Sequence, residues 1–540
     1  MKLLRGVAIL TVAALFFIVS LFAASPGASQ GTGSTLTIAV YKAAGDLNPF
    51  AYKSIFDAQT MVFDPLVQYG PEGKFLPGLA QSWDISSDRR TVTFHLRPNV
   101  RFSDGSPWNA QTALLSLHQW VGNEKIASFL GSAGRISSVE ATGDLTLVMR
   151  LKEPYFPLLQ ELSLVRPVRF VAKDGFDATG HYQRPVGTGP FKVVNNTETE
   201  TVFERNDYYW GPKPRVSRVV LKVIPDAQTR LAALSSGNVD VLGGDWTAPI
   251  TPQQAMTLKQ SAGVHLLTGP GTTTLLLAFN YRPGHVTTDA AVRKAVSLAI
   301  DRSAVVRNRF LGFAQPASTL FPPTVPLSDT SATVPALNLE QAKNVLEAAG
   351  WTGAGIRQKA GNTLTLKFLV SEEAEPGSVA LAEIIQAELR PIGVNVDIAP
   401  VDHATYHDAA PAGQFDLTVY ETIGAPYDPL TTLTNYFQST VANSEGKIWM
   451  DSKGLDPLIE AVLEAQSDAA RRSAYQNVYR FLTEQTAFVP LAYPQRIWAY
   501  GKRVRDIALA TTDYDFPLAG VGVSALSGTW GVAMAQAPSH

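Results

Sequence analysis

The residue with the clearest chemical potential in this sequence is Arg166. It follows an apolar run over residues 155–165, and the downstream motif GTGPF places Gly187 and Gly189 on either side of Thr188. A cation at the end of a packed apolar segment, near a tight backbone turn, is typical of the wall of a ligand cleft. A planar guanidinium can hold a carboxylate through two parallel hydrogen bonds. A salt bridge between two chain segments is the alternative, and the residues by themselves leave both open.

A second segment with polar and aromatic side chains is the loop ETIGAPYDPL over residues 421–430, which carries Tyr427 and Asp428. It follows a strand expected over residues 415–420. In open α/β sheets, ligands bind beyond the carboxyl ends of the strands. We therefore expect this loop to contribute to a cleft.

The best arrangement for direct metal binding is the pair His403 and His407, four positions apart in VDHATYHDAA. On a helix this spacing places both imidazoles on one face, where they could hold a metal ion. Exposed short helices produce such pairs by chance. We therefore assign no metal site and keep the two histidines as weak candidates only.

Motifs of the common enzyme classes are absent. The sequence contains no HExxH, no GxSxG, no Walker phosphate loop and no calcium-loop spacing. We therefore expect a protein that is not an enzyme. A secreted hydrolase remains a remote alternative from a different class.

Composition narrows the remaining classes. The chain has 45 basic and 47 acidic residues and no run of five like charges, so nothing indicates a nucleic-acid partner. It has no cysteine, which excludes disulfides, thiol catalysis, thiolate metal sites and a lipid-bearing cysteine. With 45% hydrophobic and 17% charged residues, the chain can bury a sizeable core.

The first residues have the pattern of a secretory signal. Lys2 and Arg5 precede a largely apolar stretch over residues 7–22, and small residues follow over 23–28. We predict a signal peptide over residues 1–28 that is cleaved on export. An uncleaved membrane anchor is the alternative.

The elements that must position these side chains alternate between strand and helix. Asp226, Asp289 and Asn338 each stand where they could cap a helix. From Thr274 the alternation repeats with cleaner helices, which indicates a second lobe. The pattern predicts an α/β fold with helices on both faces of its sheets. Strands are expected over 36–40, 91–96, 145–151, 219–224, 239–242, 275–280, 364–370, 394–398, 415–420 and 489–493.

Several motifs together resemble one family. They are LNPF (47–50), DPLVQYGPEGKFLPGLAQSW (64–83), TFHLRPNVRFSDGSPWNA (93–110), GTGPF (187–191) and IPDAQTRLAALSSGNVDV (224–241). The chain resembles the extracytoplasmic solute-binding proteins, family 5, which serve dipeptide, oligopeptide and nickel ABC importers. The likeness covers nearly all of the mature chain. Residues 154–170 and the motif GAPYDP are more similar to the nickel-binding branch.

The resemblance implies a two-lobed type 2 periplasmic binding protein, the Venus-flytrap fold of the large cluster with an extra subdomain in lobe I. We expect lobe I over residues 29–274, lobe II over 275–496, and a return to lobe I with the C-terminal tail over 497–540. The strand crossings near Thr274 and Ile497 are the expected hinge.

The resemblance also implies site residues. Arg166 matches a chelator-binding arginine, and Tyr52, Phe56 and Tyr427 match aromatic pocket positions. Other positions depart from the nickel branch: Phe129 and Ile423 stand near its tryptophans, Ile126 near its second arginine, and Val441 near its metal-contacting histidine.

In the peptide branch an aspartate holds the ligand's ammonium, and here Ala425 occupies that place. Asp428 could substitute for it only if the loop turns differently. With Thr188, it completes the predicted ligand-binding set.

The function implied is that of a periplasmic receptor, without a lipid anchor and without a cofactor. It would capture a small carboxylate-bearing ligand, most closely a chelate of nickel or another transition metal, and deliver it to ABC permease subunits with cytoplasmic ATPases. A receptor for di- or oligopeptides is the alternative within the family. We expect a monomer.

Overall fold

The computed structural model describes residues 34–51, 53–127, 130–244, 246–439, 454–516, 518 and 520–524. The predicted signal peptide and the last residues of the tail lie outside this part of the chain. Within it, no helix combines the length and the apolar character needed to cross a membrane.

The main sheet contains 12 strands in the order β18-β17-β19-β13-β20-β11-β1-β10-β9-β8, and β12 and β14 pair with β20 beside this path. The strands are β1 (Thr35–Val40), β8 (Phe191–Asn196), β9 (Glu200–Arg205), β10 (Arg218–Val223), β11 (Val241–Gly243), β12 (Val264–Pro270), β13 (Leu275–Phe279), β14 (Ala314–Pro316), β17 (Thr365–Val370), β18 (Asn395–Pro400), β19 (Leu417–Glu421) and β20 (Phe488–Gly501).

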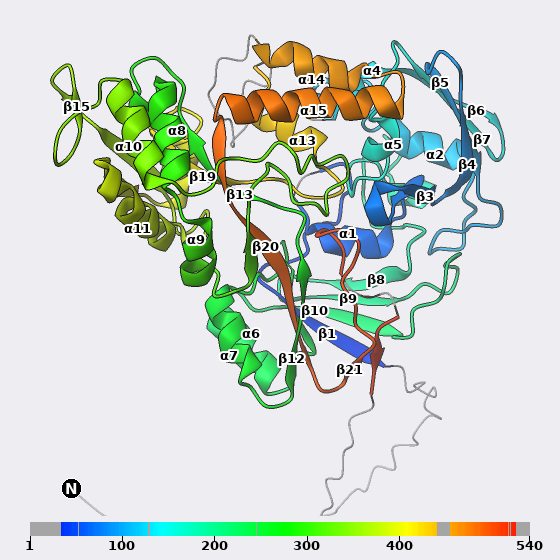
Figure 1. Ribbon diagram of the computed structural model, residues 1–540. Helices are drawn as coiled ribbons and strands as arrows, with labels where there is room; N and C mark the ends of the chain where they lie inside the picture. Colours follow the sequence, from blue (N-terminus) through cyan, green and yellow to red (C-terminus); the bar gives the residue numbers. More distant parts are fainter. Residues whose placement is uncertain are drawn as a thin grey trace, which may run out of the picture. The chain divides into compact units, whose positions relative to one another are not determined.

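Strand β20 is the continuous element at the centre of this sheet (Figure 1). Its first part pairs antiparallel with β13, where Leu275 lies opposite Ala492. Its last part pairs antiparallel with β12, where Pro270 lies opposite Gln495. The two crossings predicted near Thr274 and Ile497 therefore run side by side.

A separate four-stranded sheet has the order β4-β5-β7-β6, from β4 (Ala80–Ile85), β5 (Thr91–Leu96), β6 (Ile136–Gly143) and β7 (Thr146–Leu151). The predicted alternation of TVTFHL is confirmed, because Val92, Phe94 and Leu96 are buried in β5. Three short pairs complete the strands: β2 (Val67–Tyr69) with β3 (Phe75–Pro77), β15 (Gln358–Lys359) with β16 (Asn362–Thr363), and β21 (Val504–Arg505) with β22 (Gly522–Val523).

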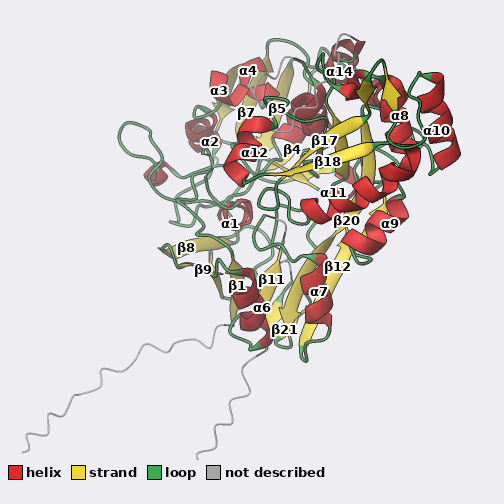
Figure 2. Cartoon of the chain, turned by 90° about the vertical axis from the view of Figure 1, so that its left-hand side faces the viewer, coloured by secondary structure: helices red, strands yellow, loops and turns green. Residues whose placement is uncertain are grey.

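Helices cover the sheets. In Figure 2, α6 and α7 lie beside β11 and β12, α11 lies beside β17 and β18, and α9 lies between α11 and β20. The helices are α1 (Phe56–Val62), α2 (Ala110–Leu117), α3 (Glu124–Ala127), α4 (Gly131–Arg135), α5 (Leu158–Glu161), α6 (Ala227–Ser235), α7 (Pro252–Lys259), α8 (Ala290–Ala299), α9 (Arg302–Arg309), α10 (Leu339–Ala348), α11 (Ser378–Leu389), α12 (His403–Ala409), α13 (Leu430–Thr432), α14 (Asp456–Leu463) and α15 (Asp468–Glu484).

Three helix starts follow the predicted capping chemistry. The side chain of Asp226 accepts a hydrogen bond from the Thr229 amide, that of Asp289 from Ala291, and that of Asn338 from Gln341. Each bond satisfies an amide that has no carbonyl partner inside its helix.

The apolar run before Arg166 differs from its helix-like expectation. Only α5 is helical, and residues 162–170 continue as an irregular buried segment. Its apolar side chains, including Leu158 and Leu162, share one core cluster with Phe94 of the small sheet and with Tyr475 and Tyr479 of α15. Contacts between distant parts of the chain, rather than local helix formation, therefore hold this segment.

Candidate functional site

A cavity of about 880 Å³ opens where α1, α5 and the segment after it, the loop after β19, and the chain after β20 meet. This volume falls within the range of small-molecule sites. The described lining has apolar or aromatic side chains at Phe50, Ala51, Phe56, Ile126, Leu130, Leu164, Trp246, Ile423, Tyr427, Leu430 and Tyr514, and polar ones at Lys53, Asn123, Lys125, Gln160, Glu161, Arg166, Thr431 and Asn435.

Arg166 lies in this wall with only 5% of its surface exposed. Its Nη1 donates to the Ser54 carbonyl at 3.1 Å, and its guanidinium carbon lies 3.6 Å from the centroid of the Phe56 ring. Phe56 is the first residue of α1, and Ser54 lies just before that helix. The start of this helix therefore fixes the plane of the guanidinium, and the cation is held at the wall where a carboxylate could approach it.

Four aromatic rings form one side of the cavity, with Tyr514 at their centre. The Tyr514 centroid lies 5.1 Å from Phe56, 5.5 Å from Trp246 and 4.8 Å from Tyr427. The Tyr514 hydroxyl donates to the Ile423 carbonyl at 2.7 Å. Because the rings come from distant parts of the chain, only the fold brings them together.

Tyr427 presents a buried hydroxyl at the cavity. Its oxygen makes no hydrogen bond of normal geometry with a described residue, although the Val165 amide lies close enough to lower its pKa. Burial raises the pKa of this phenol to about 12, against the opposing effect of the nearby Arg166 and Arg169 guanidinium groups. The hydroxyl therefore stays protonated and can donate to a ligand acceptor.

Gln160 joins the two sides of the cavity. Its Nε2 donates to the carbonyls of Pro426 at 2.8 Å and Asp428 at 3.3 Å, and its Oε1 accepts from Nη2 of Arg471 at 3.0 Å. The side chain thus ties α5 to the loop that carries Tyr427 and to helix α15.

The charged side chains favour an anionic ligand. Lys53, Lys125 and Arg166 bring positive charge to the lining, and Glu161 is the one carboxylate among its described residues. Glu161 is already engaged, since its oxygens accept from the Tyr155 hydroxyl at 2.5 Å and from the Ser132 amide at 2.7 Å. Burial raises the pKa of this carboxyl, against the opposing effect of these hydrogen bonds.

The structure places the predicted residues unevenly. Arg166, Phe56, Tyr427 and Ile423 line the cavity, and their contact with a ligand stays a prediction. Tyr52 and Phe129 fall outside the described residues.

Thr188 lies away from the cavity lining. It is fully buried, and its hydroxyl donates to Oδ2 of Asp64 at 2.9 Å. The neighbouring Gly187 packs so closely on α1 that a Cβ there would lie 2.0 Å from the Val62 carbonyl oxygen. The GTGPF turn therefore serves packing against α1, which differs from the expected ligand contact.

Asp428 also points away from the lining. Its Oδ2 accepts from the Gly424 amide at 2.7 Å and its Oδ1 from the Thr432 amide at 3.1 Å. Burial raises its pKa to about 7. Both carboxylate oxygens of Asp428 bind backbone amides of this loop and of α13. The conformation of the loop therefore does not direct Asp428 toward the ammonium group of a ligand in the cavity.

The histidine pair lies on α12, with ring centroids 4.2 Å apart. Neither imidazole lines the cavity. Across the part of the chain that the structure describes, no group of three or more His, Asp or Glu side chains could hold a metal ion.

Sequence reasoning missed Tyr514, Trp246 and Gln160. Tyr514 and Trp246 carry no local pattern that distinguishes them from other aromatic residues. Gln160 did carry a signal, since it is an uncharged polar residue within the apolar run over residues 155–165. A buried polar side chain is expected to have specific partners.

The model of the bacterial extracellular solute-binding proteins, family 5 (middle), matches residues 74–444. The chain belongs to this family. The nickel-binding periplasmic protein of Escherichia coli is 33% identical over 461 residues, which cover 83% of this chain and 87% of that protein. A di/tripeptide-binding protein of Pseudomonas aeruginosa is 26% identical and covers 89% of this chain and 94% of its own.

Two solved structures support the same family. The NikA protein of Brucella suis, in complex with Fe(III)-EDTA, is 31% identical with a TM-score of 0.84, over 91% of this chain and all of that one. An ABC transporter substrate-binding protein of Sinorhizobium meliloti is 38% identical with a TM-score of 0.80 and the same coverage. The predicted family and its two-lobed α/β fold are thus confirmed. The family is a transport family rather than a catalytic one, and its members work with ABC permease and ATPase subunits.

Proposed function

We propose that this protein captures a small carboxylate-bearing ligand in the periplasm for an ABC importer, and that the ligand is a chelate of nickel or another transition metal. The observation that carries the proposal is Arg166, a buried guanidinium fixed against Phe56 in the wall of an 880 Å³ cavity. The metal would be cargo, carried in by its chelator.

The chemistry of the wall supports an anion better than a peptide. A peptide ammonium needs an available acceptor such as a carboxylate, but the oxygens of Glu161 and Asp428 already accept hydrogen bonds from other groups of the protein. A carboxylate, by contrast, meets Arg166 and the Tyr427 hydroxyl. The aromatic rings around Tyr514 would cover the apolar parts of a chelator.

The names of two relatives support a metal chelate, whereas that of the di/tripeptide-binding protein supports the peptide alternative. The relative that is 33% identical is a nickel-binding protein, and NikA of Brucella suis was crystallised with Fe(III)-EDTA. A ligand that contacts both sides of the cavity would favour closure of the two lobes, and the closed form would then dock on the permease.

Thermal unfolding with a ligand panel tests the proposal. The panel contains Fe(III)-EDTA, Ni(II) with excess L-histidine, and several dipeptides, each at saturating concentration. We expect at least one chelate to raise the melting temperature, because a ligand that binds only the folded state stabilises it. If only the dipeptides raise the melting temperature, the cargo is a peptide and not a metal chelate.

A further inference from the structure

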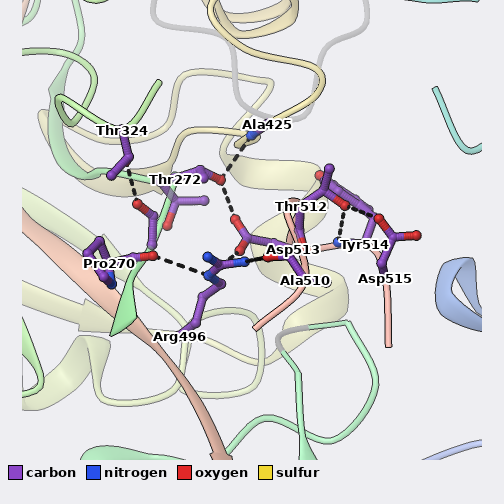
Figure 3. Close-up of polar contacts among 12 residues, drawn as sticks. Pro270, Thr272, Thr324, Ala425, Arg496, Ala510, Thr512, Asp513, Tyr514 and Asp515 are labelled. Atoms are coloured by element: carbon purple, nitrogen blue, oxygen red, sulfur yellow. Dashed lines mark hydrogen bonds and ion pairs between the residues drawn. The ribbon is translucent and has the colours of Figure 1, made fainter. Parts of the chain in front are cut away.

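Asp513 occupies the centre of a polar network beside the cavity (Figure 3). Its side chain is 2% exposed, and its Oδ1 lies 3.2 Å from Nε of Arg496. Its Oδ2 accepts a short hydrogen bond from the hydroxyl of Thr272. One carboxylate therefore contacts two chain segments that are more than 200 residues apart in the sequence.

Those two segments are the crossings between the halves of the main sheet. Thr272 lies between β12 and β13, and Arg496 lies in β20 just after the part that pairs with β13. Arg496 also donates to the Pro270 carbonyl at 3.2 Å and to the Ala510 carbonyl at 2.6 Å. The guanidinium thus fastens both crossings to the chain that follows β20.

The same network reaches the cavity wall in two directions. The next residue after Asp513 is Tyr514, the central ring of the aromatic wall. The Thr272 hydroxyl accepts from the Ala425 amide at 2.9 Å, and Ala425 lies two positions before Tyr427. A displacement at the crossings would therefore be transmitted to both tyrosines.

We propose that Asp513 is a positioning residue that couples the crossing segments to the cavity wall through Thr272 and Tyr514. The inference rests on the proposed binding function, because it gives that cavity its connection to lobe movement. Asp513 does not line the cavity and acts through its neighbours. Ligand contact with Tyr427 and Tyr514 would hold the crossings in one arrangement, and loss of the carboxylate would release them.

Hydrogen exchange of the ligand-free protein tests the coupling without any choice of ligand. In an Asp513→Asn variant we expect amides over residues 271–275 and 490–496 to exchange about tenfold faster, since a charge-assisted contact is lost at that point. The matched control is Asp240→Asn. Asp240 is similarly buried, accepts from the Thr37 amide at 2.9 Å and lies 3.5 Å from Nε of Arg503, but it is outside the network.

Dissociation of Fe(III)-EDTA, followed by stopped flow, provides the second readout. Asp513→Asn and Thr272→Val should each release the chelate about tenfold faster. Thr272→Ser, which retains the hydroxyl, and Asp240→Asn should release it at the parent rate.

Equal exchange at the crossings in the Asp513→Asn and Asp240→Asn variants would overturn the inference. So would equal release rates for Thr272→Val and Thr272→Ser. If the parent binds no member of the ligand panel, the proposed function fails, and the exchange result still decides whether Asp513 holds the crossings.

Discussion

The environment of Arg166, more than its charge, makes it a candidate for ligand binding. Arg293 offers a direct comparison, since it is 3% exposed, its guanidinium carbon lies 4.1 Å from the Tyr281 ring, and it donates to the Thr287 carbonyl at 2.8 Å. Its stacking and its carbonyl partner resemble those of Arg166, but Arg293 does not line the cavity. Stacking on an aromatic ring therefore fixes both guanidinium groups, and the adjoining cavity is what distinguishes Arg166 from Arg293.

An Arg166→Lys variant should bind Fe(III)-EDTA about 10 to 100 times more weakly, because a point charge replaces the planar fork and a hydrogen bond to a charged group contributes about 1.5–3 kcal/mol. Isothermal titration calorimetry measures the change. The control is Arg293→Lys, which should lower the melting temperature without changing the affinity. If the two variants bind Fe(III)-EDTA with equal affinity, Arg166 does not contact the ligand.

At the scale of elements, a short helix and two loops form the walls, and long-range hydrogen bonds hold them together. Helix α5 has only four residues, and the loop after β19 has no regular structure before α13. Gln160 and Arg471 connect these elements to the longer helix α15. The geometry of the site thus depends on side-chain contacts between elements more than on the stability of any one of them.

A Gln160→Leu variant should release its ligand about tenfold faster, since it loses the hydrogen bonds that hold the loop of Tyr427 against α5. Stopped-flow dissociation of Fe(III)-EDTA measures this rate. Asn280→Leu is the matched control, because Asn280 is also a buried amide, donating to the carbonyls of Gly413 at 2.7 Å and Phe415 at 2.8 Å away from the cavity. Both substitutions should lower the melting temperature. If Asn280→Leu also releases Fe(III)-EDTA faster than the parent, the specific role of Gln160 is contradicted.

At the scale of the whole molecule, several buried or half-buried carboxyl groups have raised pKa values. Burial is the main cause in each case, and the pKa reaches about 7 at Glu375, Glu388, Glu421 and Asp428. In the unfolded chain such groups titrate near pH 4. Between about pH 4 and pH 7 the folded state therefore binds more protons than the unfolded state.

Stability should therefore decrease as the pH rises from 5 through 7, and these groups should change it little above about pH 8. Each group adds a slope of at most about 1.4 kcal/mol per pH unit. Thermal unfolding at pH 5, 6, 7 and 8 measures the trend. An Asp428→Asn variant should show a weaker pH dependence, and a parent melting temperature that rises between pH 5 and pH 7 would refute the expectation.

The sequence by itself determined the alternation of strands and helices, three helix caps and the family. These features depend on residue periodicity, on capping within three positions and on motifs, all of which are local in the chain.

The tertiary structure alone decided which polar residues face the cavity. Asp428 and Thr188 were expected at the site, but the fold directs the first to backbone amides and the second to Asp64. Tyr514 and Gln160 line the cavity but were not predicted to do so. Their partners lie about 90 to more than 450 positions away in the sequence. No local pattern in the sequence predicts these contacts, because they form only when the chain folds.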